Sequence, residues 1–199
     1  MGTLATTPGF IVQDAKNWPN FKNKSMSGYE TKSLFLNKNN KFEDVAKDVG
    51  ITFTDDGRGV AAVDLDNSGT LDLVYANQGA KARVYRNVQS SGNKWIKLTL
   101  EGSGSSNRDA IGSKVTITNK GIKTVIEKDG GNSHGAQSDP RIHLGLKDSK
   151  QAEEVQIIWP SGKVDTFKNV EANKSYYLKE GSGKLTEVNQ EVLQIHGKK

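Results

Sequence analysis

Residues 60–76 read Val60-Ala-Ala-Val-Asp64-Leu-Asp66-Asn67-Ser68-Gly69-Thr70-Leu-Asp72-Leu-Val-Tyr-Ala76, which is an acidic turn between two apolar runs. The runs are short and apolar, which predicts a β-strand on each side of a reversal at Gly69, where glycine allows a positive φ. The residues with oxygen ligands stand at alternate places, so they can converge on one hard cation: Asp64, Asp66, Ser68, Thr70 through its backbone carbonyl, and Asp72. A calcium ion takes six to eight such oxygens, so the loop predicts a Ca²⁺ site.

A plain turn is the alternative interpretation, because Asp, Asn, Ser and Gly all favour turns. Three aspartates at spaced positions would repel one another unless a cation lay among them, and no cationic side chain is expected beside them. The loop also differs from an EF-hand, since the twelfth place holds no glutamate and the flanks are strand-like. We therefore expect a calcium loop on a β scaffold.

The composition favours an all-β protein. Of 199 residues, 34% are hydrophobic and 21 are glycine, and no stretch carries a long helical stripe. The absence of cysteine excludes disulfides, thiolate zinc sites and cysteine nucleophiles. The sequence contains no run of 18 apolar residues, so we expect no segment inserted in a membrane. The first 24 residues do not have the basic and then apolar segments of a signal peptide.

The basic charge is too dispersed to predict nucleic-acid binding. The net charge is +5, but residues 1–89 hold 11 basic and 10 acidic residues, and residues 90–199 hold 17 and 13. Only five of the 28 basic residues are arginine, whose planar fork suits phosphates and bases. Three arginines have an aspartate within two residues, which predicts ion pairs that fix loops: Arg58 with Asp56, Arg108 with Asp109, and Arg141 with Asp139.

Short strand patterns continue along the chain and divide it into four parts. We expect an irregular arm at 1–28, a calcium-binding β unit at 29–89, a β-sandwich at 90–181 and a tail at 182–199. The tail can add a strand or a helix. Strands are predicted at 33–37, 41–46, 59–63, 71–75, 82–87, 95–100, 114–118, 121–126, 141–146, 155–159, 163–167 and 175–179. Residues 42–49 have a short helical turn as their alternative.

Two blocks of sequence resemble known families. Gly57-Arg-Gly-Val-Ala-Ala-Val-Asp-Leu-Asp-Asn-Ser-Gly-Thr-Leu-Asp-Leu73 resembles an FG-GAP or VCBS repeat, the calcium-loop blade of β-propellers. The blocks that follow resemble the ASPIC/UnbV domain: Gly102 to Gly112 with Asn107-Arg108-Asp109, then Gln137 to Leu146, then Trp159-Pro-Ser-Gly162. The resemblance extends from about residue 28 to residue 181.

The resemblance implies a fold and a setting. The fold is one propeller-blade-like β unit with a calcium loop packed on an ASPIC/UnbV-like β-sandwich, and the setting is secreted or periplasmic, as in bacterial proteins similar to cartilage acidic protein. It supports Asp64, Asp66, Ser68, Thr70 and Asp72 as calcium ligands, although the fifth place is usually acidic. A single blade cannot close a propeller.

Two functions follow as expectations. The first is a calcium-binding, non-catalytic extracellular-type module that binds a protein or glycan partner, in an oligomeric state that the sequence leaves open. Its contact or loop-fixing residues would be Asn107, Arg108, Asp109 and the 130–138 loop. The alternative is an enzyme or accessory factor of small-molecule biosynthesis, with a pocket near His134, Asp139 and Arg141. His143 is expected on the outer face of a strand or in a local hydrogen bond.

Overall fold

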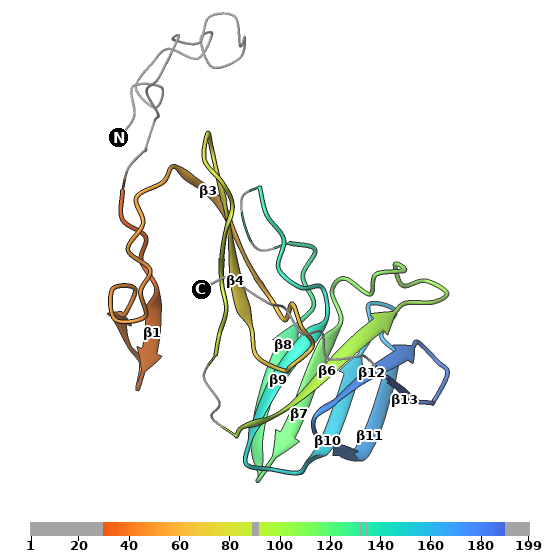
Figure 1. Cartoon of the computed structure of the whole chain (residues 1–199). Helices are drawn as coiled ribbons and strands as arrows, with labels where there is room; N and C mark the ends of the chain where they lie inside the picture. Colours follow the sequence, from red (N-terminus) through yellow and green to blue (C-terminus); the bar gives the residue numbers. More distant parts are fainter. Residues whose placement is uncertain (1–29, 89–91, 132, 134, 190–199) are drawn as a thin grey trace, which may run out of the picture. The chain divides into compact units, whose positions relative to one another are not determined.

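The protein is all-β, as predicted. The structure is a computed structural model that describes residues 30–88, 92–131, 133 and 135–189. In these ranges it contains thirteen strands and no helix (Figure 1). The predicted arm at 1–28, His134 and the end of the tail lie outside the described residues, and the described part of the chain holds no helix that could cross a bilayer.

Two four-stranded sheets form a β-sandwich. One sheet has the order β11-β10-β7-β8 and the other the order β13-β12-β6-β9. Strand β6 pairs parallel with β12 and antiparallel with β9. The strands are β6 (Lys94–Glu101), β7 (Lys114–Asn119), β8 (Ile122–Glu127), β9 (Ile142–Lys147), β10 (Gln151–Ile158), β11 (Val164–Glu171), β12 (Lys174–Lys179) and β13 (Thr186–Val188). The tail thus contributes a strand.

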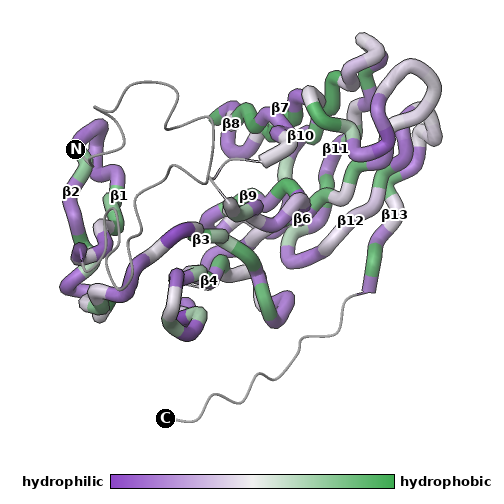
Figure 2. Tube along the Cα trace, turned by 90° about the horizontal axis from the view of Figure 1, so that it is seen from above, coloured by the Kyte–Doolittle hydropathy of each residue, from purple (hydrophilic) through white to green (hydrophobic). Residues whose placement is uncertain are grey.

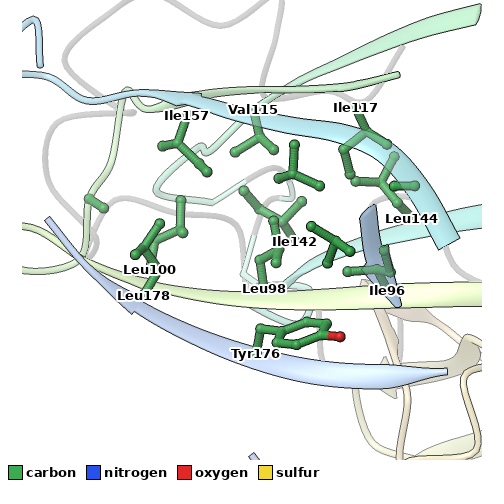
Figure 3. Close-up of a cluster of buried hydrophobic side chains, with 14 of the residues drawn as sticks. Ile96, Leu98, Leu100, Val115, Ile117, Ile142, Leu144, Ile157, Tyr176 and Leu178 are labelled. Atoms are coloured by element: carbon green, nitrogen blue, oxygen red, sulfur yellow. The ribbon is translucent and has the colours of Figure 1, made fainter. Parts of the chain in front are cut away.

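Alternating apolar residues fill the space between the two sheets. Val115, Ile117 and Ile157 come from one sheet, and Ile96, Leu98, Leu100, Ile142, Leu144 and Leu178 come from the other (Figure 3). Polar residues stand between these positions, so hydrophilic and hydrophobic residues alternate along the strands (Figure 2). Each fully buried side chain of this size contributes about 1.5–3 kcal/mol to folding, so this cluster is the main core of the described chain.

Two tight turns close hairpins of the sandwich. Asn119 pairs with Ile122 across a two-residue turn, in which Lys120 and Gly121 have φ values of 49° and 71°. This is the left-handed geometry that suits the twist of antiparallel strands. In the second hairpin, Trp159 N donates to Lys163 O at 2.9 Å, and Gly162 has a φ of 86°.

The remaining strands form two small sheets. Strand β1 (Phe35–Lys38) pairs with β2 (Lys41–Asp44). Strands β3 (Gly57–Val63), β4 (Asp72–Asn77) and β5 (Arg83–Tyr85) form a three-stranded sheet. Residues 41–44 form a strand, as predicted. The chain then makes one helix-like turn, in which Val49 N donates to Val45 O at 3.1 Å, so the helical alternative for residues 42–49 holds only from residue 45 onward.

The chain divides into two compact units, and the acidic loop belongs to the second. Of the described residues, those at 30–59 and 75–83 belong to the first unit, and those at 60–74 and from 84 onward belong to the second. In the first unit, Phe53 and Tyr75 meet edge to face with their ring centroids 5.1 Å apart, and Arg58 pairs with Asp56 at 2.7 Å as predicted. Strands β3, β4 and β5 each contain residues of both units. The predicted domain boundaries at 89/90 and 181/182 stay predictions.

Candidate functional site

The 64–72 loop connects β3 to β4 and is held by its own carboxylates. Ser68 N donates to Asp64 Oδ1 at 3.0 Å and to Asp66 Oδ1 at 3.1 Å, and Gly69 N donates to Asp64 Oδ2 at 2.7 Å. Asn67 and Gly69 have φ values of 59° and 89°, so the predicted positive φ at Gly69 is confirmed. The side chains of Asp64 and Asp66 thus act first as acceptors for the backbone of their own turn.

Asp72 joins the end of the loop to the segment that follows β5. Its Oδ1 accepts a hydrogen bond from Asn87 N at 2.8 Å, and its Oδ2 accepts one from Leu65 N at 3.4 Å. The hydroxyl groups of Ser68 and Thr70, the other predicted ligands, lie 2.8 Å apart and pair with each other. Asp72 is buried, so these contacts satisfy a carboxylate that has little access to water.

Two cationic side chains lie beside the three aspartates, so the expectation of no cationic neighbour is wrong. Lys97 forms an ion pair with Asp64, and Arg86 forms one with Asp66 and a second with Asp72, in which Arg86 Nε lies 3.4 Å from Oδ2. Burial raises the pKa of Asp66, but hydrogen bonds from Ser68 and the Arg86 charge bring it below its usual value. The sequence could not reveal the Lys97 contact, because alternation along β6 places this lysine on the face opposite the core, where solvent is expected.

The loop as it is folded does not fit a calcium ion. Each of the three aspartates already lies in an ion pair with a side-chain cation, Asp64 with Lys97 and both Asp66 and Asp72 with Arg86. Calcium requires six to eight oxygens directed at one point. Among the residues that the structure describes, no group of three or more acidic, His or Cys residues is arranged to hold a metal.

Asp139 and Arg141 form the predicted ion pair and hold the acidic loop against the segment before β9. Arg141 Nε lies 2.9 Å from both carboxylate oxygens of Asp139, and Arg141 Nη1 donates to Asn67 Oδ1 at 3.0 Å. Ala62 at the end of β3 accepts a hydrogen bond from Asp139 N at 2.9 Å. Burial raises the pKa of Asp139, but hydrogen bonds from Arg141 overcome this effect and lower it. This pair therefore fixes a loop.

His143 lies on the outer face of β9, opposite Lys97 in the β6–β9 register. Its ring meets Trp95 edge to face at 6.2 Å between centroids. Burial and the nearby Lys97 charge lower the pKa of His143 below its usual value. The outer-face prediction is confirmed, whereas the pocket predicted near His134 involves a residue outside the described part of the chain.

Asn107 fixes the loop that precedes β7. Its side-chain amide donates to Ile111 O and its side-chain oxygen accepts from Ile111 N, both at 2.8 Å. Gly102 N donates to Arg108 O at 2.9 Å, and an added Cβ at Gly102 would lie 2.0 Å from Asn107 O. The predicted pair between Arg108 and Asp109 is not found among the ion pairs of the described residues.

A cleft of about 450 Å³ lies beside this loop. Its walls come from β6, from the 109–111 loop, from the segment after β8 and from the segment before β9. The lining residues are Thr99, Leu100, Asp109, Ile111, Lys128, Asp129, Gly130, Gln137, Pro140 and Arg141. Asp109 and Arg141, two residues singled out from the sequence, are thus brought to one cleft.

Glu180 is a buried acid that the sequence analysis missed. It follows β12, and its carboxylate accepts hydrogen bonds from Ser161 Oγ at 2.5 Å and Ser103 N at 2.8 Å. Burial raises the pKa of Glu180, but the bonds from Ser161 and Ser103 overcome this effect and lower it. The only signal in the sequence was the presence of serines in two loops, Gly102–Ser106 and Trp159-Pro-Ser161-Gly. These serines donate hydrogen bonds and therefore require an acceptor such as the Glu180 carboxylate.

Comparison with known proteins supports part of the predicted family resemblance. A search of curated proteins finds no match. The family model described as ASPIC and UnbV matches residues 102–185, from the end of β6 to the segment before β13. The acidic loop lies outside this match, and its likeness to an FG-GAP or VCBS repeat stays a prediction. Within this all-β chain, residues 102–185 are therefore similar to the family described as ASPIC and UnbV.

Proposed function

We propose that the chain is a non-catalytic β module of the extracellular type, secreted or periplasmic, that binds a protein partner at the cleft beside Ile111. The observation that carries this proposal is the cleft itself, to which both predicted partner loops contribute. Its apolar residues lie among acidic, basic and amide side chains, a mixture that is typical of protein interfaces. Sugar rings usually stack on aromatic side chains, and the described residues of the lining include none. A glycan partner is therefore the less favoured alternative.

Ile111 is the proposed central contact. The residue is 42% exposed although its side chain is large and apolar. The two hydrogen bonds from Asn107 hold its backbone in place, so little ordering is required when a partner binds. A rigid apolar residue at the rim of a polar cleft is a suitable anchor for a protein surface.

The test compares two exposed apolar residues of the sandwich. Ile111→Asp and Val164→Asp each place a charge on an exposed site, and Val164 on β11 is 53% exposed and is not part of the cleft lining. Both variants and the parent chain are screened against purified extracellular proteins and a glycan array. We expect saturable binding to a protein that weakens by about tenfold or more in Ile111→Asp, as for an interface anchor, and that Val164→Asp retains. Binding to glycans alone, or equal protein binding by both variants, would contradict the proposal.

Calcium binding and the FG-GAP or VCBS assignment stay predictions and are not part of this proposal. The spacing of the 64–72 loop and the three-stranded sheet around it support them. The contacts of Lys97 and Arg86 count against a resident ion, so no part of the proposed function depends on calcium.

The enzyme alternative has less support. Asp109 and Arg141 line one cleft, but the Arg141 guanidinium already binds Asp139 and Asn67. An acid–base or substrate-binding role would require this pair to separate. The contacts of Asp139 and Arg141 are those of a structural ion pair.

A further inference from the structure

Lys97 is a buried cation whose place in the fold has to be explained. Its neighbours Ile96 and Leu98 point into the sandwich core, so Lys97 points out of the opposite face of β6. Its side chain is nevertheless only 1% exposed, and its ion-pair partner among the described residues is Asp64. An ammonium group without a counter-charge is costly to bury. Lys97 and the acidic loop therefore depend on each other.

The surroundings of Lys97 fix its ammonium group at the loop. The ammonium lies 4.6 Å from the centroid of the Trp95 ring, a cation–π distance. The loop reversal lies directly on the same ring, because a Cβ added at Gly69 would come within 1.8 Å of Trp95 Nε1. The contact is thus built from β6 and from the loop together.

Arg86 supplies a second positive charge at the loop. It forms an ion pair with Asp66 and a second one with Asp72, and its side chain is 30% exposed. The two cations together bring a charge of +2, the charge of one calcium ion, to three aspartates. A calcium ion placed among the aspartates would be repelled by both cations, and the repulsion is strongest at the buried Lys97.

We propose that Lys97 and Arg86 are the resident counter-ions of the 64–72 loop and take the place of a divalent cation. The loop then folds without calcium, and Lys97 determines that the loop excludes the ion. Removal of the Lys97 charge converts the loop into one that requires calcium. This inference concerns the loop alone and does not depend on the proposed partner cleft, so either can fail without the other.

The test measures thermal stability and calcium binding of the full chain. The parent chain should show the same Tm in chelator and in about 10 mM calcium, a concentration at least about tenfold above the dissociation constants of extracellular calcium modules. Lys97→Met keeps most of the side-chain volume and removes the charge. We expect a lower Tm in chelator, recovery of Tm with calcium, and calcium binding at least about tenfold tighter than in the parent chain. Arg86→Met should show the same changes to a smaller extent, because Arg86 is partly exposed.

Two controls separate charge from packing. Lys174→Met removes a surface lysine that pairs with Glu171 and Glu187, and it should produce no response to calcium. Asp64→Asn combined with Lys97→Met removes both members of the buried pair, and this double variant should be stable in chelator and insensitive to calcium.

Three results would overturn the inference. The first is saturable calcium binding by the parent chain with a Tm that falls in chelator, which would support the calcium prediction instead. The second is a folded Lys97→Met variant that gains no calcium binding. The third is a Lys97→Met variant that stays unfolded at every calcium concentration while the double variant folds.

Discussion

Single side chains determine how the acidic loop lies on the sandwich. Gly69 is required there for two reasons, since its φ is 89° and a side chain would overlap the Trp95 indole. The first reason could be derived from the sequence, because a tight acidic turn needs a glycine. The second could not, because Trp95 lies 26 positions further along the chain and only the fold brings its ring to the turn.

His143 makes stability depend on pH. Three charged groups lie near the His143 ring: Lys97 from β6, Asp64 from the loop and Asp139 from the segment before β9. Burial and the Lys97 charge lower the pKa of His143 below 6.5. The unfolded chain therefore binds more protons than the folded chain as the pH falls from 6.5 toward the lowered pKa. Stability is fully present above pH 6.5 and is lost as the pH falls through this range.

His143→Gln should flatten this part of the stability curve. The measurement is urea unfolding of the parent and the variant at several pH values between about 5 and 7, where other side chains with ordinary pKa values change little. The depressed carboxyl pKa values affect stability mainly below about pH 5, because the ordinary values are 3.8 for Asp139 and 4.5 for Glu180. The same slope in both proteins would show that His143 does not cause the dependence.

Among the strands, the local sequence pattern was sufficient to predict where each strand lies but not which strands pair with each other. All twelve predicted strands are present, because alternation and turn residues are local signals. The parallel pairing of β6 with β12 brings together segments about 80 residues apart, and no local signal specifies it. Pairings of this kind decide where the loops meet, which explains why Lys97 and Glu180 were missed as site residues.

Glu180 should stabilise the end of the sandwich where β12 finishes. Its buried carboxylate binds Ser161 Oγ and Ser103 N, which belong to two different loops. Glu180→Gln keeps the shape but removes the charge from these bonds, and we expect a loss of about 1–3 kcal/mol in the free energy of unfolding. The measurement is urea denaturation at neutral pH.

Glu187→Gln on β13 is the matched control, because Glu187 is an exposed residue that pairs with Lys174 at 2.7 Å. Exposed ion pairs contribute little to stability. A loss in Glu180→Gln no larger than that in Glu187→Gln would contradict the role assigned to the buried carboxylate.

At the scale of the whole molecule, the two compact units differ in how much apolar surface they bury. In the described residues of the first unit, the buried hydrophobic residues are Ala46, Ile51, Phe53 and Tyr75. The second unit contains the cluster between the two sheets of the sandwich. Because hydrophobic burial is the main favourable contribution to folding, we expect the first unit to open at a lower urea concentration than the second.

Hydrogen exchange of the full chain at increasing urea concentrations measures this difference, with peptides from 41–54 reporting the first unit and peptides from 94–101 the second. Phe53→Ala should speed exchange in the first unit, since loss of a buried phenylalanine costs about 3–5 kcal/mol. Leu98→Ala, a matched change in the sandwich core, should act on the second unit at a cost of about 2–5 kcal/mol. If the units unfold separately, Phe53→Ala leaves exchange in 94–101 unchanged. Equal acceleration of both sets of peptides by either substitution would mean that the chain unfolds as one cooperative body despite its two compact units.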